Sequence, residues 1–182
     1  MPQAAGSDPG EDITELLKST IRDVIDFPQP GIVFKDITPL LGDGAAFASV
    51  IRALAAGHEG VTKVAGIEAR GFILAAPVAL ALGAGFVPVR KLGKLPAETY
   101  AQSYELEYGT ATLEVHIDAF APSDRVLIVD DVLATGGTAA ATAELVRQSG
   151  AEVAGIVVLL ELEFLAGRAK VPDIAVRSLL AV

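Results

Sequence analysis

Cysteine and tryptophan are absent from the 182 residues, and histidine occurs only twice. Without cysteine the chain cannot form a disulfide or a thiolate metal site. His58 and His116 have no metal-like spacing, so no metal site made by protein side chains is expected. No apolar run reaches the roughly 18 residues that suggest a membrane span, so no membrane partner is expected.

Basic residues are also few. Lys and Arg number 14 against 23 Asp and Glu, which gives a net charge of −9. A chain this acidic does not favour nucleic acid as a partner. It can still bind a phosphorylated small molecule through local basic residues and backbone amides.

Apolar residues are abundant, at 52% of the chain, and 182 residues suit one domain. Residues 1–12 are rich in Gly, Pro, Ser and acid and predict a disordered tail, which leaves 13–182 as the single domain. Because the amino terminus lacks signal-peptide architecture, a cytoplasmic location is expected.

Apolar strand-like runs alternate with helical patterns along most of the chain. Strands are expected at 61–67, 85–89, 126–129 and 153–160, and helices at 13–25, 45–56, 71–82 and 139–148. This alternation predicts an α/β fold with a doubly wound, mainly parallel sheet and right-handed crossovers. Residues 100–108 and 111–117 alternate polar and apolar side chains around Gly109, which predicts a two-stranded hairpin.

The strongest functional signal is Val126-Leu-Ile-Val-Asp-Asp-Val-Leu-Ala-Thr-Gly-Gly-Thr138. Its apolar start predicts a strand buried on both faces, and Asp130 and Asp131 follow at the carboxyl end, where open α/β sheets bind ligands. The small-residue turn after them opens a helix and offers backbone N–H groups and hydroxyls to a phosphate. That turn consists of Ala134, Thr135, Gly136, Gly137 and Thr138. The two carboxylates suit a polyol, a metal or a developing positive charge.

This segment resembles the phosphoribosyl-pyrophosphate (PRPP) signature of type I phosphoribosyltransferases. Four more segments are similar, in order, to the adenine phosphoribosyltransferase family: 27–37, 66–72, 89–96 and 104–109. The resemblance implies transfer of the 5-phosphoribosyl group from PRPP to adenine, giving AMP and pyrophosphate in purine salvage. It also implies Mg2+ bound mainly through PRPP, a homodimer, a small amino-terminal hood at about 13–40 and a flexible flap at about 95–118.

The resemblance assigns two segments to pyrophosphate. In the family, the loop holding Glu68, Ala69 and Arg70 meets pyrophosphate through backbone amides and the Arg, and a cis peptide at Glu68–Ala69 is expected. A second segment is a basic cluster directly after a strand, formed by Arg90, Lys91 and Lys94. It is either an ordinary solvated charge run or a pyrophosphate-neutralising loop, and the second interpretation is preferred. In family dimers this loop often reaches the neighbouring subunit's site.

Three acids receive catalytic roles from the resemblance. Asp130 and Asp131 would flank the ribose and stabilise the positive charge that develops as pyrophosphate leaves. Glu107, in the flap, would hydrogen-bond the N7 edge of adenine and act as the acid/base partner when N9 attacks.

The adenine itself would lie between Phe34 and Leu162, and the main chain at Val33 and Lys35 would read its N6/N1 edge. Lys35 stands where many relatives have Arg, which leaves base preference dependent on whether the side chain takes part. The alternatives are a 6-oxopurine or other type I phosphoribosyltransferase, and a non-catalytic regulator that senses PRPP or purines.

Overall fold

The computed structural model describes residues 9–105 and 109–182, with side chains from residue 13 onward. The chain forms two compact units that divide between Ala53 and Leu54. The residues expected to form the hood belong to the first unit, and the sheet that carries the site belongs to the second. None of the helices within the described ranges is both long and apolar enough to cross a membrane.

The first unit holds helix α1 (Pro9–Thr20), strands β1 (Arg22–Ile25) and β2 (Val33–Asp36), helix α2 (Thr38–Gly42) and most of α3 (Gly44–Ala55). Helix α1 begins inside the segment expected to be a tail, with Pro9 at its first turn, a position that proline tolerates.

The predicted helix at 13–25 is wrong beyond Thr20. Strand β1 instead pairs antiparallel with β2, with Val24 opposite Phe34. Val24 and Ile25 are β-branched and favour extended backbone, and this pairing overrides the helical spacing of the apolar residues.

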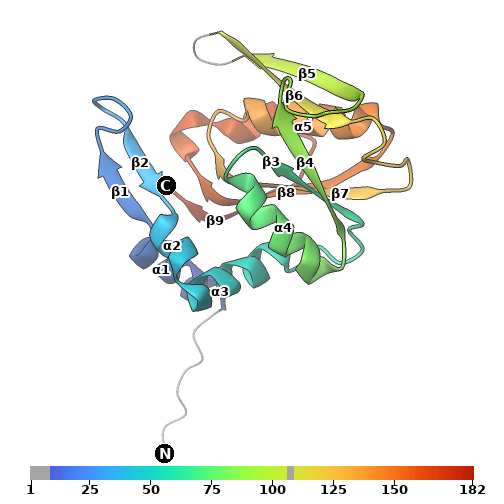
Figure 1. Ribbon diagram of the computed structural model, residues 1–182. Helices are drawn as coiled ribbons and strands as arrows, with labels where there is room; N and C mark the ends of the chain where they lie inside the picture. The colour runs from blue at the N-terminus through green and yellow to red at the C-terminus, as the bar shows by residue number, and fades with distance from the viewer. Residues whose placement is uncertain (1–8, 106–108) are drawn as a thin grey trace, which may run out of the picture. The chain divides into compact units, whose positions relative to one another are not determined.

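The second unit contains a seven-stranded sheet in the order β5-β6-β4-β3-β7-β8-β9 (Figure 1). Its strands are β3 (Lys63–Ile67), β4 (Gly85–Lys91), β5 (Thr99–Glu105), β6 (Thr110–His116), β7 (Arg125–Leu133), β8 (Glu152–Glu161) and β9 (Val176–Ala181). Its helices are α4 (Gly71–Leu82), α5 (Gly137–Gln148) and the 3-10 turns η1 (Glu163–Leu165) and η2 (Gly167–Lys170). Strands β4, β3, β7, β8 and β9 run parallel to one another, whereas β6 pairs antiparallel with β4 and β5 pairs antiparallel with β6.

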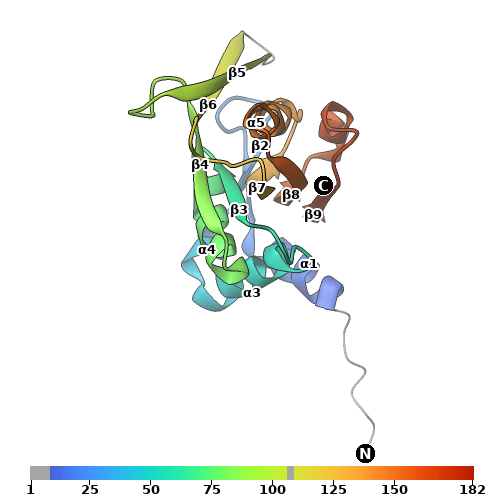
Figure 2. The same cartoon turned by 90° about the vertical axis from the view of Figure 1, so that its right-hand side faces the viewer.

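The winding of the sheet reverses between β3 and β7. The crossover from β3 through α4 leads to β4 on one side, and the crossover from β7 through α5 leads to β8 on the other. Because such crossovers are right-handed, α4 and α5 lie on opposite faces of the sheet, as Figure 2 shows. The predicted doubly wound α/β fold is confirmed.

Strand β7 is the centre of the core. Val126, Leu127, Ile128 and Val129 are fully buried, as the apolar run predicted. The strand is longer than predicted, however, because Asp130 pairs with Val158 and Leu133 with Glu161 of β8. The two aspartates therefore lie within the last part of the strand rather than after it.

The hairpin expected at 100–117 is formed by β5 and β6, which pair from Thr99–His116 to Glu105–Thr110. Its base joins the parallel sheet where Arg90 of β4 pairs with Glu114. Figure 1 shows the hairpin extending beyond the parallel strands of the sheet, on the side of α5.

Candidate active site

Three of the predicted site segments meet at the reversal point of the sheet. Strands β3 and β7 are direct neighbours, with Gly66 opposite Val129, so their carboxyl ends lie side by side. The N–H of Glu68 donates to the carbonyl of Val89 at 3.0 Å, which ties the end of β4 to the same place. Ligands of open α/β sheets bind at such a reversal point.

The two aspartates of β7 have different surroundings. The side chain of Asp131 is only 7% exposed, and its Oδ2 lies 2.7 Å from Nη2 of Arg70 in an ion pair. Asp130 accepts the backbone N–H of Asp131 at 2.9 Å. Burial, and next the charge of Asp131, raise the pKa of the Asp130 carboxyl well above its ordinary value. A carboxylate in such a setting is stabilised by a hydroxyl donor or by a positive charge that arrives with a ligand.

Space for the Asp130 carboxylate depends on the start of α4. A Cβ at position 71 would lie 2.8 Å from Oδ1 of Asp130 and 3.0 Å from the carbonyl oxygen of Val129. Gly71 therefore allows the helix to begin directly against the aspartate.

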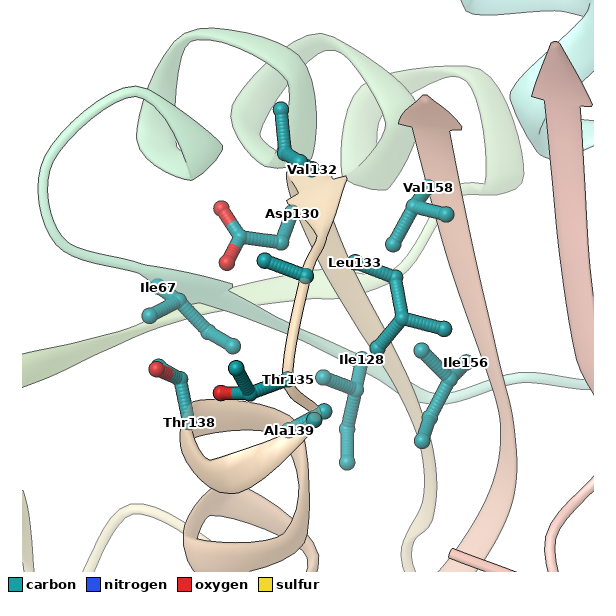
Figure 3. Close-up of a pocket in the computed structure, with 12 residues that line it drawn as sticks. Ile67, Ile128, Asp130, Val132, Leu133, Thr135, Thr138, Ala139, Ile156 and Val158 are labelled. Atoms are coloured by element: carbon teal, nitrogen blue, oxygen red, sulfur yellow. The ribbon is translucent and has the colours of Figure 1, made fainter. Parts of the chain in front are cut away.

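The predicted phosphate loop borders a small cavity of about 60 Å³. Figure 3 shows Asp130 on one side of it and the side chains of Thr135 and Thr138, at the start of α5, on another. Gly136 has φ +79°, a left-handed conformation that glycine adopts without the strain of other residues. The N–H of Ala140 donates to the carbonyl of Gly136 at 2.9 Å, so the helix begins at this turn and its positive dipole end faces the cavity.

The residues of the predicted basic cluster contact the Glu68 carboxylate. Oε2 of Glu68 lies 3.3 Å from Nε of Arg90 and accepts the Lys91 backbone N–H at 3.0 Å. Nζ of Lys94 lies 4.0 Å from Oε1 of Glu68. The hydrogen bond from Lys91 is the main reason why the pKa of Glu68 is lowered, although burial opposes it and the Arg90 interaction adds to it. The Glu68–Ala69 peptide is cis, as expected. Arg90 and Lys94 thus gather at Glu68, two residues before Arg70 in the chain, whereas Lys91 contributes its backbone N–H.

The predicted adenine contacts are divided between the two units. Val33, Phe34 and Lys35 form β2 in the first unit, where Nζ of Lys35 bonds to Oδ1 of Asp23 at 2.8 Å. Leu162 follows β8 in the second unit and donates its N–H to Leu133 at 2.9 Å. Glu107 lies outside the described residues.

Sequence comparison then identifies the chain. Residues 39–179 match the phosphoribosyl transferase domain. An adenine phosphoribosyltransferase of Streptomyces coelicolor is 66% identical over 160 residues, which cover 87% of this chain and 88% of the relative. The chain belongs to the adenine phosphoribosyltransferase family.

Solved structures of adenine phosphoribosyltransferases agree. The enzyme from Rhodothermus marinus superposes with a TM-score of 0.89 at 54% identity, covering 94% of this chain and 99% of that one. The enzyme from Saccharomyces cerevisiae, complexed with adenine and an imino-altritol bisphosphate, gives 0.89 at 39% identity over 93% and 99%. The predicted family membership and enzyme class are confirmed.

One part of the site's surroundings was missed from sequence. The bend between η1 and η2 places Gly167 against the phosphate loop, and Arg168 next to it binds Glu161 at the end of β8. Glu161 and Arg168 are seven residues apart on a strand end and a 3-10 turn, so no helical or strand periodicity links them.

Proposed function

We propose that this protein transfers the 5-phosphoribosyl group of PRPP to adenine and releases AMP and pyrophosphate. The observation that carries the proposal is the cavity shared by Asp130 and the Thr135–Thr138 turn, in a chain 66% identical to an adenine phosphoribosyltransferase. The turn provides backbone N–H groups and hydroxyls for a 5′-phosphate, and Asp130 lines the same cavity.

In this proposal the second unit binds both ends of the PRPP molecule, the 5′-phosphate and the pyrophosphate. Thr135 to Thr138 hold the 5′-phosphate. Arg70, Arg90 and Lys94 hold the pyrophosphate, and their present carboxylate partners, Asp131 and Glu68, keep these cations in place until the anion arrives. Lys91 belongs to the same pyrophosphate-binding group, and its backbone N–H donates to Glu68. The Glu68–Ala69 peptide offers its amides to pyrophosphate.

The reaction then forms one bond and breaks one at C1′. The N9 lone pair of adenine attacks C1′, and the C1′–O bond breaks, with its electron pair leaving on pyrophosphate. Positive charge develops on the ribose in between, and Asp130 and Asp131 stabilise it electrostatically. The proton that the purine ring must lose leaves N7 for Glu107, which acts as general base.

Adenine is selected by backbone groups in this account. Main-chain atoms at Val33 and Lys35 read the 6-amino edge, and Phe34 packs on a face of the ring. A 6-oxo purine accepts where adenine donates, so it would leave a buried backbone acceptor unpaired. The pairing of the Lys35 side chain with Asp23 supports a structural role for that side chain.

We assign Mg2+ to the substrate. Within residues 13–105 and 109–182, whose side chains the structure describes, no group of three or more His, Cys, Asp or Glu side chains is arranged to hold a metal ion. Asp130 is the side chain suited to accept a metal-bound water, since its carboxylate borders the cavity and Asp131 is already paired with Arg70. Mg2+ bound to PRPP would neutralise charge on the leaving pyrophosphate.

We also propose a homodimer. Three large apolar side chains are exposed on α4 and the adjoining β4, namely Ile73, Leu80 and Phe86, and Leu80 is 83% exposed. Phe72 of α4 and Phe86 of β4 pack edge to face with ring centroids 5.9 Å apart, so the two elements present one surface. A second copy covering this surface would remove it from water. Light scattering should give twice the chain mass, and Leu80→Asp should shift the protein to monomer.

A cytoplasmic location remains a prediction.

Turnover of purine bases tests the proposal. With PRPP and Mg2+, adenine should release pyrophosphate, whereas a 6-oxopurine enzyme would prefer hypoxanthine or guanine. A regulator would bind PRPP without turnover of any base.

A further inference from the structure

The position of the phosphate loop depends on a glycine that follows it in sequence by some thirty residues. Gly167 is buried, and a Cβ built on it would overlap the carbonyl oxygen of Ala134 and lie 3.1 Å from the nitrogen of Gly136. In the reverse direction, a Cβ on Gly136 would overlap the carbonyl of Gly167. The two backbones are therefore in direct contact, and the loop cannot shift toward the bend between η1 and η2 unless that bend shifts too.

The residue after this glycine is held by a buried carboxylate. Arg168 donates from Nε to Oε1 and from Nη2 to Oε2 of Glu161, both at 2.6 Å, and from Nη1 to the carbonyl of Val176 at 2.6 Å. The hydroxyl of Ser178 donates to Oε2 of Glu161 at 2.8 Å. The side chain of Glu161 is 7% exposed. A bidentate pair with one buried member fixes orientation as well as distance.

The anchor itself lies in the sheet. Glu161 ends β8, where it pairs with Leu133 of β7 and Ala181 of β9. The next residue, Leu162, donates its N–H to the carbonyl of Leu133, directly before the loop begins. The cluster of Glu161, Arg168 and Ser178 thus connects the rigid sheet to the contact surface of the phosphate loop.

We propose that the Glu161–Arg168–Ser178 cluster positions the phosphate loop through Gly167 and so sets the affinity for the 5′-phosphate of PRPP and AMP. None of the three side chains lines the cavity, so each is a positioning residue and not a catalytic one. Catalytic sites are held in place by such supporting contacts. The inference rests on the proposed function, because it takes the 5′-phosphate as the ligand of the loop.

The test compares Arg168→Lys, Arg168→Gln and Gly167→Ala with the wild-type chain. Calorimetry would give the Kd of AMP, and steady-state kinetics would give KM for PRPP and, at saturating PRPP, KM for adenine. Displacement of a binding group by about 1 Å costs up to about a hundredfold, so Kd for AMP and KM for PRPP should rise at least about tenfold in Arg168→Gln and Gly167→Ala. Arg168→Lys should recover part of this loss, since it keeps the charge without the two-pronged geometry. KM for adenine should stay within about twofold.

Arg147→Gln is the matched control. Arg147 forms an exposed ion pair with Asp173 at the far end of α5, away from the loop, so its loss removes an Arg–carboxylate pair without touching Gly167. Thermal unfolding of each variant gives the stability effect separately. If Arg168→Gln lowered Tm while the AMP Kd stayed at the wild-type value, the positioning role would be overturned. If Arg168→Gln did not fold, an unchanged PRPP KM in Gly167→Ala would overturn it equally. Absence of turnover in the wild-type chain would instead count against the proposed function, and AMP binding by the variants would still test the inference.

Discussion

Replacing Asp130 by Asn should stabilise the ligand-free protein at neutral and alkaline pH while lowering turnover. Burial and the charge of Asp131 raise the pKa of the Asp130 carboxyl. The folded state therefore binds more protons than the unfolded state between the two pKa values, and the free energy of unfolding falls as pH rises through that interval. Asn does not ionise, and its side-chain oxygen can still accept the Asp131 N–H, so the variant avoids this loss.

The size of the gain follows from the setting of the side chain. One unit of difference between the folded and unfolded pKa corresponds to about 1.4 kcal/mol. Relief of a strained functional group commonly gains about 0.5–2 kcal/mol, and 1 kcal/mol shifts the Tm of a chain of this size by about 2–4 °C. We therefore expect Asp130→Asn to raise Tm by about 1–8 °C near pH 8 and by less near pH 4.5.

Differential scanning calorimetry at both pH values measures this, and Asp124→Asn is a control of opposite sign. Burial alone would raise the pKa of Asp124, but hydrogen bonds from the Ala121 N–H and the Thr62 hydroxyl bring it below its ordinary value. Its carboxylate thus contributes stability above the unfolded pKa, and that contribution is lost as pH falls through the folded pKa. Asp124→Asn should therefore destabilise most at the higher pH. A lower Tm for Asp130→Asn than for wild type near pH 8, or an equal difference in Tm at both pH values, would show that ionised Asp130 does not destabilise the folded state.

Three further substitutions test separate parts of the site. Glu107→Gln should lower kcat by about 10²–10⁴ with little effect on KM for PRPP, because only proton transfer is lost; single-turnover kinetics would show a slow chemical step. Arg90→Gln should raise KM for PRPP by about tenfold and leave KM for adenine near its original value, since a charge-assisted contact to pyrophosphate is removed, and an equal change in both would contradict the assignment. Lys35→Gln should leave the ratio of kcat/KM for adenine and hypoxanthine within about threefold, and a collapse of the ratio would show that the side chain reads the base.

Sequence was sufficient for the centre of the fold and for the segments that meet there. The run from Val126 to Val129 is apolar at every position, as expected of a strand covered on both faces. The small-residue turn after it allows a ligand or another backbone to approach closely. Once those strands were placed in a doubly wound sheet, the neighbouring ends of β3 and β7 followed from topology.

Contacts made across the fold were beyond the reach of sequence patterns. The apolar spacing through Ile25 suits a helix, and only the pairing of Val24 with Phe34 shows that β1 is a strand. Likewise, the sequence around Glu161 and Arg168 gives no sign that the two side chains interact. Their ion pair forms only because the chain bends after β8. Local periodicity encodes which face of an element is apolar but not which distant segment will cover it.

Phosphoribosyl transfer to adenine can be measured by assaying a panel of purine bases with PRPP and Mg2+ for pyrophosphate release. We expect AMP formation from adenine, with kcat/KM at least about tenfold above that for hypoxanthine or guanine. A smaller ratio, a preference for a 6-oxopurine, or binding of PRPP without turnover of any base would contradict it.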